Sequence, residues 1–370
     1  MKIPFVDLKS QYLSIKDEID TAISDVINST AFVGGEYVNN FEKYFQSLYG
    51  VKHCVSVANG TDSLYIIMKM LGIGLGDEVI TVANSWISSS ETITQTGAKP
   101  VFVDINSDYF SIDENLLAKS ITGKTKALIL VHLHGQMNNM DYIIDFCQKN
   151  QIYLIEDCAQ SHFSQYKENL AGTMGIAGSF SFYPGKNLGA YGDAGCIITN
   201  DDDLARKCKM FARHGAVTKH KHEIEGINSR MDGIQAAILT AKLPHILNWT
   251  EQRIKNAALY NTMLGLLRDF VVTPAVRNDT KHSFHLYVIR AKQRDELAQY
   301  LGAHGIETAI HYPTALPNLP CYKHLGLSES DFPISSSFQK TILSLPMYPE
   351  LTSEHIRYIV NKITEFYEQQ

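Results

Sequence analysis

The chain has 370 residues, a formal net charge of −6 and a sequence pI near 6.2, and 45% of its residues are hydrophobic. This is the composition of a globular protein long enough for two domains. Its acidic balance argues against a nucleic-acid binder, which would carry a basic face. No apolar run reaches the roughly 18 residues of a membrane span, and no secretory segment opens the chain. The six cysteines form no CxxC pair, which indicates a reduced, cytoplasmic protein.

The first 50 residues predict an extended arm followed by two amphipathic helices. Isoleucines recur with i, i+4 spacing from Ile15 to Ile27, which gives the first helix one apolar stripe. A glycine turn at 34–35 separates it from a second helix, whose stripe contains Phe41 and Phe45. Each helix therefore has one face that is expected to pack against the rest of the chain.

A candidate phosphate site follows at the start of the next helix. A short strand at 53–57 leads into ANGTDSL, residues 58–64, which opens that helix. Unpaired N–H groups and the positive end of the helix dipole face outward at such a start. Gly60 and Thr61 are therefore candidates to hold a phosphate group. Ordinary helix capping by the same residue types is the alternative.

From residue 78 to 131, strand-like runs alternate with helical or loop segments, which predicts βαβ units and a parallel sheet. Trp86 lies on the loop after the first of these strands. An aromatic side chain at this place either fills the core or stacks on a planar ligand, and the pattern alone leaves both open.

The stretch from 151 to 200 carries the strongest chemical signal. A buried strand at 152–155 ends on Glu156-Asp157, where open α/β sheets bind their ligands. A second strand-like run, 179–183, breaks at a Pro-Gly pair and leaves Lys186 on a glycine-rich loop. Glycines permit close approach of the backbone to a ligand. A lysine there can form a Schiff base if burial lowers its pKa, and an aspartate can keep a pyridine nitrogen protonated. A solvated lysine and a helix-capping aspartate are the alternatives.

The C-terminal third predicts a smaller α+β domain. Residues 213–231 read as a solvated loop, and its His220-Lys221-His222 triplet lacks the cysteines or carboxylates of a metal site, so no metal is expected. Two helices follow from Asp232, then a strand at 283–290, a helix at 292–303 and a short strand near Thr308. We expect the large domain to span 1–245 and the small domain 246–370.

Several motifs together resemble one family. The segments are FVDLKSQY near the N-terminus, ANGTDSL, EDCAQSH, SFSFYPGKNLGAYGDAG, GINSRMDGIQAA and HYPTALP. They resemble the DegT/DnrJ/EryC1/StrS family of sugar aminotransferases, which are fold-type I pyridoxal 5'-phosphate (PLP) enzymes, over almost the whole chain. The resemblance implies an α/β fold with a mostly parallel seven-stranded sheet flanked by helices. Within the family the chain is most similar to 3-aminotransferases acting on dTDP-3-keto-6-deoxyhexoses.

The resemblance also assigns roles to residues of this chain. Lys186 would be the catalytic lysine and Asp157 the acid partner of the ring nitrogen. The other expected cofactor contacts are Gly60, Thr61, Trp86, Gln160, Ser181 and Asn228, with Trp86 stacking on the ring and Asn228 reaching the cofactor of a partner subunit. The expected substrate contacts are His162, Tyr183, His311 and Tyr312. The chain departs from the commonest family pattern at His134, Gly185 and Tyr191.

The activity implied by this resemblance is transfer of an amino group from glutamate to a keto group of a nucleotide-linked 6-deoxyhexulose, at C3, for deoxyamino-sugar biosynthesis. The enzyme would be a cytoplasmic homodimer with shared active sites, binding neither nucleic acid nor membrane. Amination at C4 is an alternative, as is a dehydratase on the same scaffold. In the resembling dehydratases a histidine replaces the lysine, so Lys186 favours transfer. A non-catalytic regulatory protein with the same fold is a further alternative.

Overall fold

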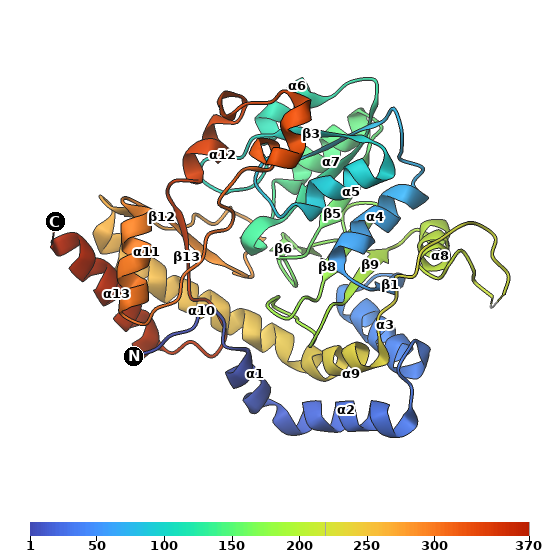
Figure 1. Cartoon of the computed structure of the whole chain (residues 1–370), viewed down its shortest axis with the longest axis horizontal. Coiled ribbons are helices and arrows are strands. Elements are labelled where there is room, and N and C mark those ends of the chain that lie inside the picture. Colours follow the sequence, from blue (N-terminus) through green and yellow to red (C-terminus); the bar gives the residue numbers. More distant parts are fainter. Residues whose placement is uncertain (219, 370) are drawn as a thin grey trace.

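A computed structural model describes residues 1–218 and 220–369 and shows a larger and a smaller part (Figure 1). The larger part is built on a seven-stranded sheet with the spatial order β1-β9-β8-β5-β4-β2-β3. β9 runs antiparallel to both of its neighbours, and the other pairs are parallel. The strands are β1 His53–Val57, β2 Glu78–Val82, β3 Lys99–Val103, β4 Thr125–Val131, β5 Tyr153–Asp157, β8 Ala177–Ser181 and β9 Gly195–Thr199. The mostly parallel seven-stranded sheet predicted from the sequence is confirmed.

Helices flank this sheet, as the βαβ pattern predicts (Figure 1). The central strands are apolar and buried, because helices cover both of their faces. The predicted N-terminal helices are present, and they bury Ile19, Phe41 and Phe45. The helices of this part are α1 Leu8–Ser14, α2 Lys16–Ser29, α3 Gly35–Tyr49, α4 Gly60–Met70, α5 Ser88–Thr96, α6 Leu117–Ser120, α7 Met140–Lys149, α8 Asp202–Phe211 and α9 Gly233–Lys242.

The smaller part has its own core around a three-stranded antiparallel sheet of order β10-β12-β13. Its strands are β10 Val271–Val272, β12 Tyr287–Ala291 and β13 Ile342–Leu345, and its helices are α10 Ile246–Leu264, α11 Arg294–Ala303 and α13 Ser353–Glu368. Helix α12 Pro333–Phe338 lies between α11 and α13 in the sequence but packs on the larger core through Phe338. A third small sheet joins β6 Gln165–Tyr166, β7 Asn169–Leu170 and β11 Thr280–Lys281. No helix in the described ranges is both long and apolar enough to cross a membrane.

One predicted strand starts later than expected. Residues 283–290 alternate like a strand, but β12 begins at Tyr287. The preceding residues bond to the loop after β4 instead, because Ser283 N donates to Gly135 O and Leu286 N to His134 O. Phe284 also has φ +44, which no extended strand permits. This segment therefore connects the smaller part to the loop after β4.

The two parts exchange segments. Ile3 pairs with Ile306 and lies in the smaller core, whereas Leu316 and Tyr322 pack with Phe102 of the larger part. Asp104 in the larger part accepts hydrogen bonds from Ile334 N and Ser335 N. The division at 245/246 stays a prediction, with α10 starting at Ile246 against the larger core.

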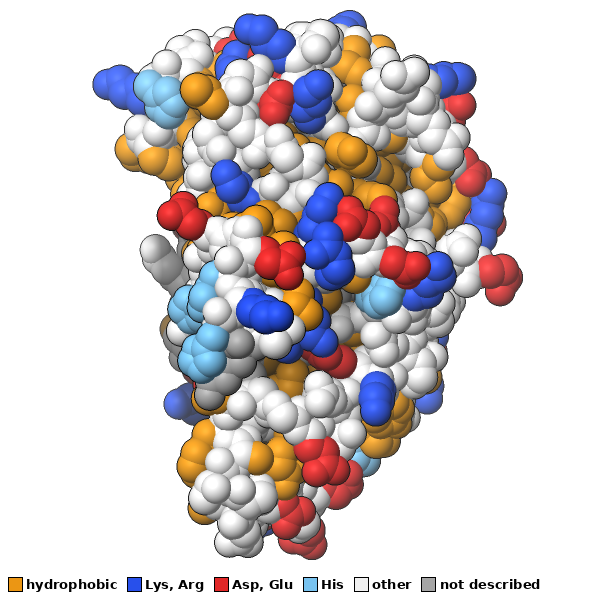
Figure 2. Space-filling model, turned by 90° about the vertical axis from the view of Figure 1, so that its right-hand side faces the viewer, with side chains coloured by type: hydrophobic (Ala, Val, Ile, Leu, Met, Phe, Trp, Pro, Cys, Tyr) orange, Lys and Arg blue, Asp and Glu red, His pale blue; other side chains and the backbone are white. Residues whose placement is uncertain are grey.

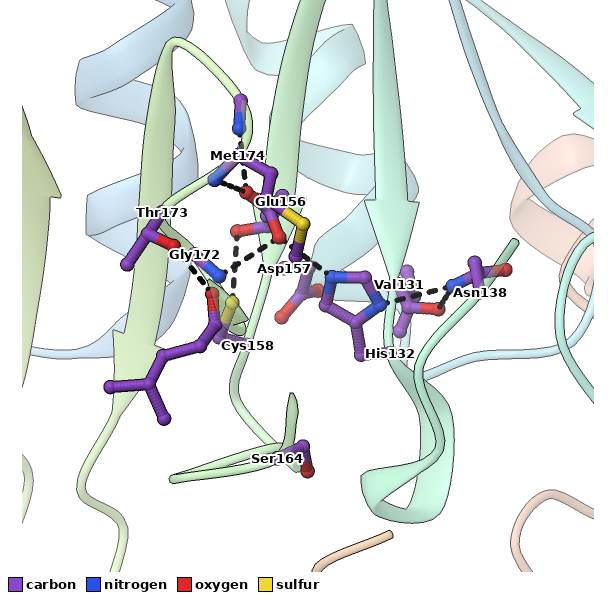
Figure 3. A network of polar contacts seen from close by, with 12 residues as sticks. Val131, His132, Asn138, Glu156, Asp157, Cys158, Ser164, Gly172, Thr173 and Met174 are labelled. Carbon is purple, nitrogen blue, oxygen red and sulfur yellow. Dashed lines mark hydrogen bonds and ion pairs between the residues drawn. The ribbon is translucent and has the colours of Figure 1, made fainter. Parts of the chain in front are cut away.

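Glu156 of β5 holds the segment at 172–175 that leads into β8 (Figure 3). Its Oε1 accepts from Met174 N (2.7 Å) and Gly175 N (2.6 Å), and its Oε2 accepts from Gly172 N (2.8 Å). His132 Nε2 donates to the same Oε2 at 2.9 Å, because His132 Nδ1 accepts from Asn138 Nδ2. A buried carboxylate is stable where all its oxygens are bonded in this way.

His132, Glu156 and Cys158 also have the composition of a metal site, with potential ligand atoms within 4.8 Å of one another. Both oxygens of Glu156 and both ring nitrogens of His132 already have hydrogen-bond partners. Burial raises the pKa of the Cys158 thiol well above its usual value, which disfavours a thiolate ligand. The group is therefore better explained as a hydrogen-bonded support for β5.

The Glu156 network predicts a large stability effect. Glu156→Gln places an amide group among backbone donors and should lower the free energy of unfolding by about 2–4 kcal/mol, measured by urea denaturation of the cofactor-free protein. Glu168→Gln is the matched control on an exposed loop, with an expected change within about 0.5 kcal/mol. Equal stabilities of the two variants would contradict a supporting role for Glu156.

Candidate active site

A tight loop presents Lys186 beyond the end of β8. Lys186 N donates to Tyr183 O (2.8 Å), and further along the loop Ala190 N donates to Phe182 O (2.7 Å). A Cβ added to Gly189 would lie 2.3 Å from Pro184 O, so the loop can close only around a glycine. The Lys186 side chain stays partly exposed. The backbone therefore fixes where the amine emerges.

Asp157 lies at the carboxyl end of β5, which pairs in parallel with β8. Its Oδ1 accepts from Ala159 N (3.1 Å) and its Oδ2 from Ser89 Oγ (3.2 Å). Burial raises the pKa of this carboxyl, and the Ala159 hydrogen bond and the Lys186 charge oppose the rise. Burial lowers the pKa of Lys186 to about 8, and the Asp157 charge opposes the fall. A sizeable fraction of free amine is thus available near neutral pH.

The start of α4 offers an anion site beside this pair. Asn59 caps the helix by accepting from Asp62 N (2.8 Å), and Ser63 N bonds to Asn59 O. The amides of Gly60 and Thr61 have no intrahelical acceptor at this position. A Cβ on Gly60 would lie 2.6 Å from the Cβ of Ser181, so helix start and strand end are in contact. Free amides and hydroxyls at a helix N-terminus suit a phosphate group.

Gln160 joins the larger part to the smaller one. Its Oε1 accepts from His134 N (2.7 Å), which leaves its Nε2 to donate to Tyr312 Oη (2.9 Å). The Tyr312 ring lies 5.8 Å from the ring of Trp86, which is 59% exposed. These aromatic rings are therefore free to contact a ligand beside the Lys186–Asp157 pair.

The remaining predicted residues lie in different surroundings. His311 bonds through Nδ1 to Ser344 Oγ (2.8 Å), and burial together with the Lys186 charge lowers its pKa to about 4. The side chains of Tyr183 and Asn228 are exposed, and among the described residues neither side chain has a hydrogen bond to Lys186. The ring of His162 is fully buried and packs against Phe180 and Phe182. The ring has no exposed surface, and the role of His162 as a substrate contact stays a prediction.

Three contributors were not expected from the sequence. Ser89 bonds Asp157, Ser88 Oγ pairs with Thr61 Oγ1 (2.7 Å), and His285 Nδ1 pairs with Asn187 Oδ1 (3.2 Å) next to Lys186. The serine run at 88–90 could have pointed to polar groups at the start of α5, since serine favours helix ends. No pattern in the sequence indicates the His285–Asn187 contact, because 98 positions separate these residues.

The chain is similar to known proteins over almost its whole length. The model of the DegT/DnrJ/EryC1/StrS aminotransferase family matches residues 13–364. A pleiotropic regulatory protein of Geobacillus stearothermophilus is 44% identical over 99% of both chains. A dTDP-3-amino-3,4,6-trideoxy-alpha-D-glucose transaminase of Streptomyces venezuelae is 36% identical over 100% of this chain and 97% of its own. The crystal structure of S. venezuelae DesV in complex with a ketimine intermediate superimposes with a TM-score of 0.96 at 36% identity, over 99% of this chain and 98% of the other. The chain therefore belongs to the DegT/DnrJ/EryC1/StrS aminotransferase family.

Proposed function

We propose that this protein is a PLP-dependent aminotransferase that moves an amino group from glutamate to the C3 keto group of a nucleotide-linked 6-deoxyhexulose, in deoxyamino-sugar biosynthesis. The observation that carries this proposal is the convergence of Lys186, Asp157 and the free amides of α4 at the carboxyl ends of neighbouring strands. An aldehyde-binding amine, a carboxylate and an anion site are what PLP requires of a protein.

The phosphate end of PLP fits the start of α4. Gly60 and Thr61 would donate their amides, and the hydroxyls of Thr61, Ser88 and Ser181 lie around the same helix end. A side chain at position 60 would collide with Ser181, so the glycine keeps this site open. Charge-assisted hydrogen bonds from amides and hydroxyls to a dianion are strong, and here they need no lysine or arginine.

Asp157 and Gln160 would hold the ring of PLP. When bound, PLP supplies an aldehyde that carries amino groups and a ring that withdraws electrons. Asp157 would hold a proton on the ring nitrogen, and that cation would in turn lower the raised pKa of the buried carboxyl. Gln160 would donate from Nε2 to the ring's phenolic oxygen, because His134 N already takes its Oε1. Trp86 would stack on the ring face.

Lys186 would bind the cofactor covalently and then act as the base. Its lowered pKa leaves free amine, which can attack an aldehyde and afterwards take up and return a proton beside the reacting carbon. The tight loop at 183–190 limits where the amine can reach. Positioning of this kind accounts for a large share of the catalysis in such reactions.

The substrate would enter on the side of Trp86 and Tyr183, which are both 59% exposed. Tyr312 and His311 of the smaller part border the same space and would contact the sugar. Among the relatives, transaminases named for dTDP sugars and aminotransferases named for UDP sugars are 36–38% identical to this chain. We favour a dTDP sugar on the resemblance described above, which also supplies glutamate as donor, and amination at C4 is the alternative.

Two chains would build each active site. Large apolar side chains are exposed on or beside the loop at 213–231, including Phe32, Val33 and Val217. Figure 2 shows the face that carries α8 and this loop, where hydrophobic patches lie between charges of both signs. Exposed apolar groups of this kind indicate a protein–protein contact. Asn228 would reach across that contact to the phosphate site of the partner subunit. The protein would be a cytoplasmic homodimer, in which the five buried cysteines remain reduced.

A regulatory role is the second candidate, since the relative at 44% identity is named a pleiotropic regulatory protein. Buried ionisable groups such as Lys186 and Asp157 lower the stability of the fold unless they are paired. A protein that catalyses no reaction would gain nothing from them or from the open start of α4. Enzyme activity and regulation are separable by measuring turnover.

The covalent role of Lys186 predicts a labelling result. Borohydride reduction of the protein with PLP, followed by peptide mapping, should place the pyridoxyl label on Lys186, because its side chain is partly exposed and its amine has a lowered pKa near Asp157. Lys186→Ala should lose both the label and the visible absorption band, whereas Lys124→Ala on the surface should keep both.

Turnover then separates the candidates. Glutamate and a dTDP-3-keto-6-deoxyhexose should yield 2-oxoglutarate and an amino sugar. A label elsewhere would contradict the site, loss of a sugar hydroxyl without 2-oxoglutarate would indicate a dehydratase, and a labelled protein without turnover on dTDP or UDP keto sugars would favour regulation.

The pKa values predict a pH profile for the cofactor-free protein. Acetylation of Lys186 by a succinimidyl ester should reach half of its maximal rate near pH 8, since the ammonium present below that pH does not react. Asp157→Asn should move this midpoint to lower pH, because the negative charge that favours the ammonium is removed. Asp269→Asn, on an exposed turn, is the matched control and should leave the midpoint in place. An Asp157→Asn midpoint at or above the wild-type value would contradict the pairing.

Shared active sites predict complementation between inactive chains. Lys186→Ala and Asn228→Ala homodimers should each be impaired. After mixing under conditions that exchange subunits, one site of each hybrid dimer is intact, so activity should recover to about a quarter of the wild-type value. Lys186→Ala mixed with Lys186→Ala,Asn228→Ala is the control and should stay inactive. No recovery in the first mixture, with hybrid dimers verified by mass, would place both residues in the same chain's site.

A further inference from the structure

Lys242, the last residue of α9, is a buried lysine that the proposed chemistry does not use. Its side chain is 0% exposed, and its hydrogen-bond acceptors in the described chain are neutral oxygens. Burial lowers the pKa of Lys242 to about 8, and the charge of Glu350 opposes the fall. Lysines are almost never fully buried without an ionic partner, because desolvating the ammonium is costly. We therefore expect Lys242 to have a role that offsets the free energy lost by desolvating its ammonium group.

The ammonium of Lys242 bonds three segments together. Nζ donates to Gly189 O (2.7 Å) on the loop that carries Lys186, residues 183–192, which we call the lysine loop. Nζ also donates to Gln11 Oε1 (3.0 Å) on α1. Nζ also lies 4.4 Å from the centre of the Tyr191 ring, within the range of a cation–π contact. Tyr12 of α1 packs edge-on against the same ring. The charge is therefore surrounded by groups of the lysine loop and of the N-terminal arm.

A second residue of α9 bonds the same segment. Gln235 lies about two helical turns before Lys242 and so on the same side of the helix. Its Oε1 accepts from Tyr191 N (2.8 Å), and a Cβ on Gly192 would lie 2.9 Å from its Nε2. Residues 189–192 are thus fixed by two side chains of one helix, through a carbonyl and an amide of the backbone.

This segment is the returning half of the loop that carries Lys186. The backbone of Gly189 packs directly against Pro184 O, and Ala190 N donates to Phe182 O. Displacement of residues 189–191 would therefore open the turn around Lys186. The N-terminus of α9 follows directly on the loop at 213–231, where Gly233 N bonds to Phe32 O. One rigid helix therefore connects the exposed apolar surface around Phe32 with the backbone of the lysine loop.

We propose that Lys242, together with Gln235, is a positioning residue for Lys186: it fixes the backbone of residues 189–192 and thereby the place of the reactive amine. This inference rests on the proposed function for the role of Lys186, but the contacts that it invokes exist in the cofactor-free protein. Lys242 touches neither the cofactor site nor the substrate side, and it acts through Gly189.

Hydrogen exchange of the full-length, cofactor-free protein tests the proposal. Lys242→Met keeps the length of the side chain and removes the charge and its donors. The amides of Lys186, Ala190 and Tyr191, whose hydrogen bonds close the loop, should then exchange about tenfold faster. Amides in the core strand β4 should exchange at the wild-type rate. Lys255→Met, on the exposed side of α10, is the matched control and should leave both regions unchanged.

Gln235→Ala keeps the proposal testable if Lys242→Met does not fold. Its side chain is only partly buried, and it should accelerate exchange at Tyr191 and at the same neighbouring amides. In the enzyme loaded with PLP, each variant should lower kcat at least fivefold while KM for the keto sugar changes less than twofold, because binding groups are untouched.

The outcomes separate the two proposals. If wild-type Lys186 takes the pyridoxyl label but exchange at 186–191 is unchanged in both variants, the positioning role is wrong and the proposed function stands. If exchange accelerates in these variants but the label maps to another residue, Lys242 fixes the loop and the proposed function is wrong. Faster exchange throughout the protein in both variants would reduce Lys242 to a stabilising residue and overturn the proposal.

Discussion

The site depends on two opposite charges at the ends of neighbouring parallel strands. Asp157 closes β5 and Lys186 follows β8, and each charge opposes the shift that burial imposes on the pKa of the other. The lysine therefore has a pKa near 8, low enough to supply free amine, and the carboxyl still has a cationic neighbour before any ligand binds. A ring nitrogen that carries a proton can take over that cationic role, which would release the lysine for chemistry.

Backbone contacts bring this pair to the anion site. The start of α4 meets the end of β8 where Gly60 faces Ser181, and the start of β9 meets Asn59 where a Cβ on Gly195 would lie 2.5 Å from the Asn59 carbonyl carbon. Side chains at these glycines would separate the helix from the sheet. Gly189 and Gly195, on either side of the turn after Lys186, are explained by close approaches to backbone of this kind, and together with Gly60 they keep the free amides, the lysine and the carboxylate in one region. In the proposed function, substrate preference depends instead on the exposed rings of Trp86 and Tyr183.

Features carried by contiguous sequence were predictable. The strand that ends on Asp157, the loop around Lys186 and the helix start at Gly60 each have a local pattern, and the parallel order of the sheet follows from the βαβ alternation. Contacts between distant segments were not predictable. Gln160 meets Tyr312, and Lys242 meets Gly189, because tertiary packing brings unrelated patterns together. The start of the strand expected at 283–290 was wrong for the same reason. Its first residues bond to the loop after β4, and a local alternation of residue types contains no information about such a distant partner.

The exchange of segments between the two parts also limits how the pocket can move. Arg253 of α10 is buried and donates to Phe284 O (3.2 Å) and Met347 O (2.8 Å), which joins the long helix to the segments before β12 and after β13. Ser335 N and Ser335 Oγ bond to Asp104 at the end of β3, so residues 316–338 belong with the larger part. A rigid rotation of the smaller part would break the bonds from Ser283 N to Gly135 O and from Leu286 N to His134 O, at a cost of several kcal/mol. The Gln160–Tyr312 contact therefore exists before ligands bind, and it holds the smaller part against the residues that follow β5.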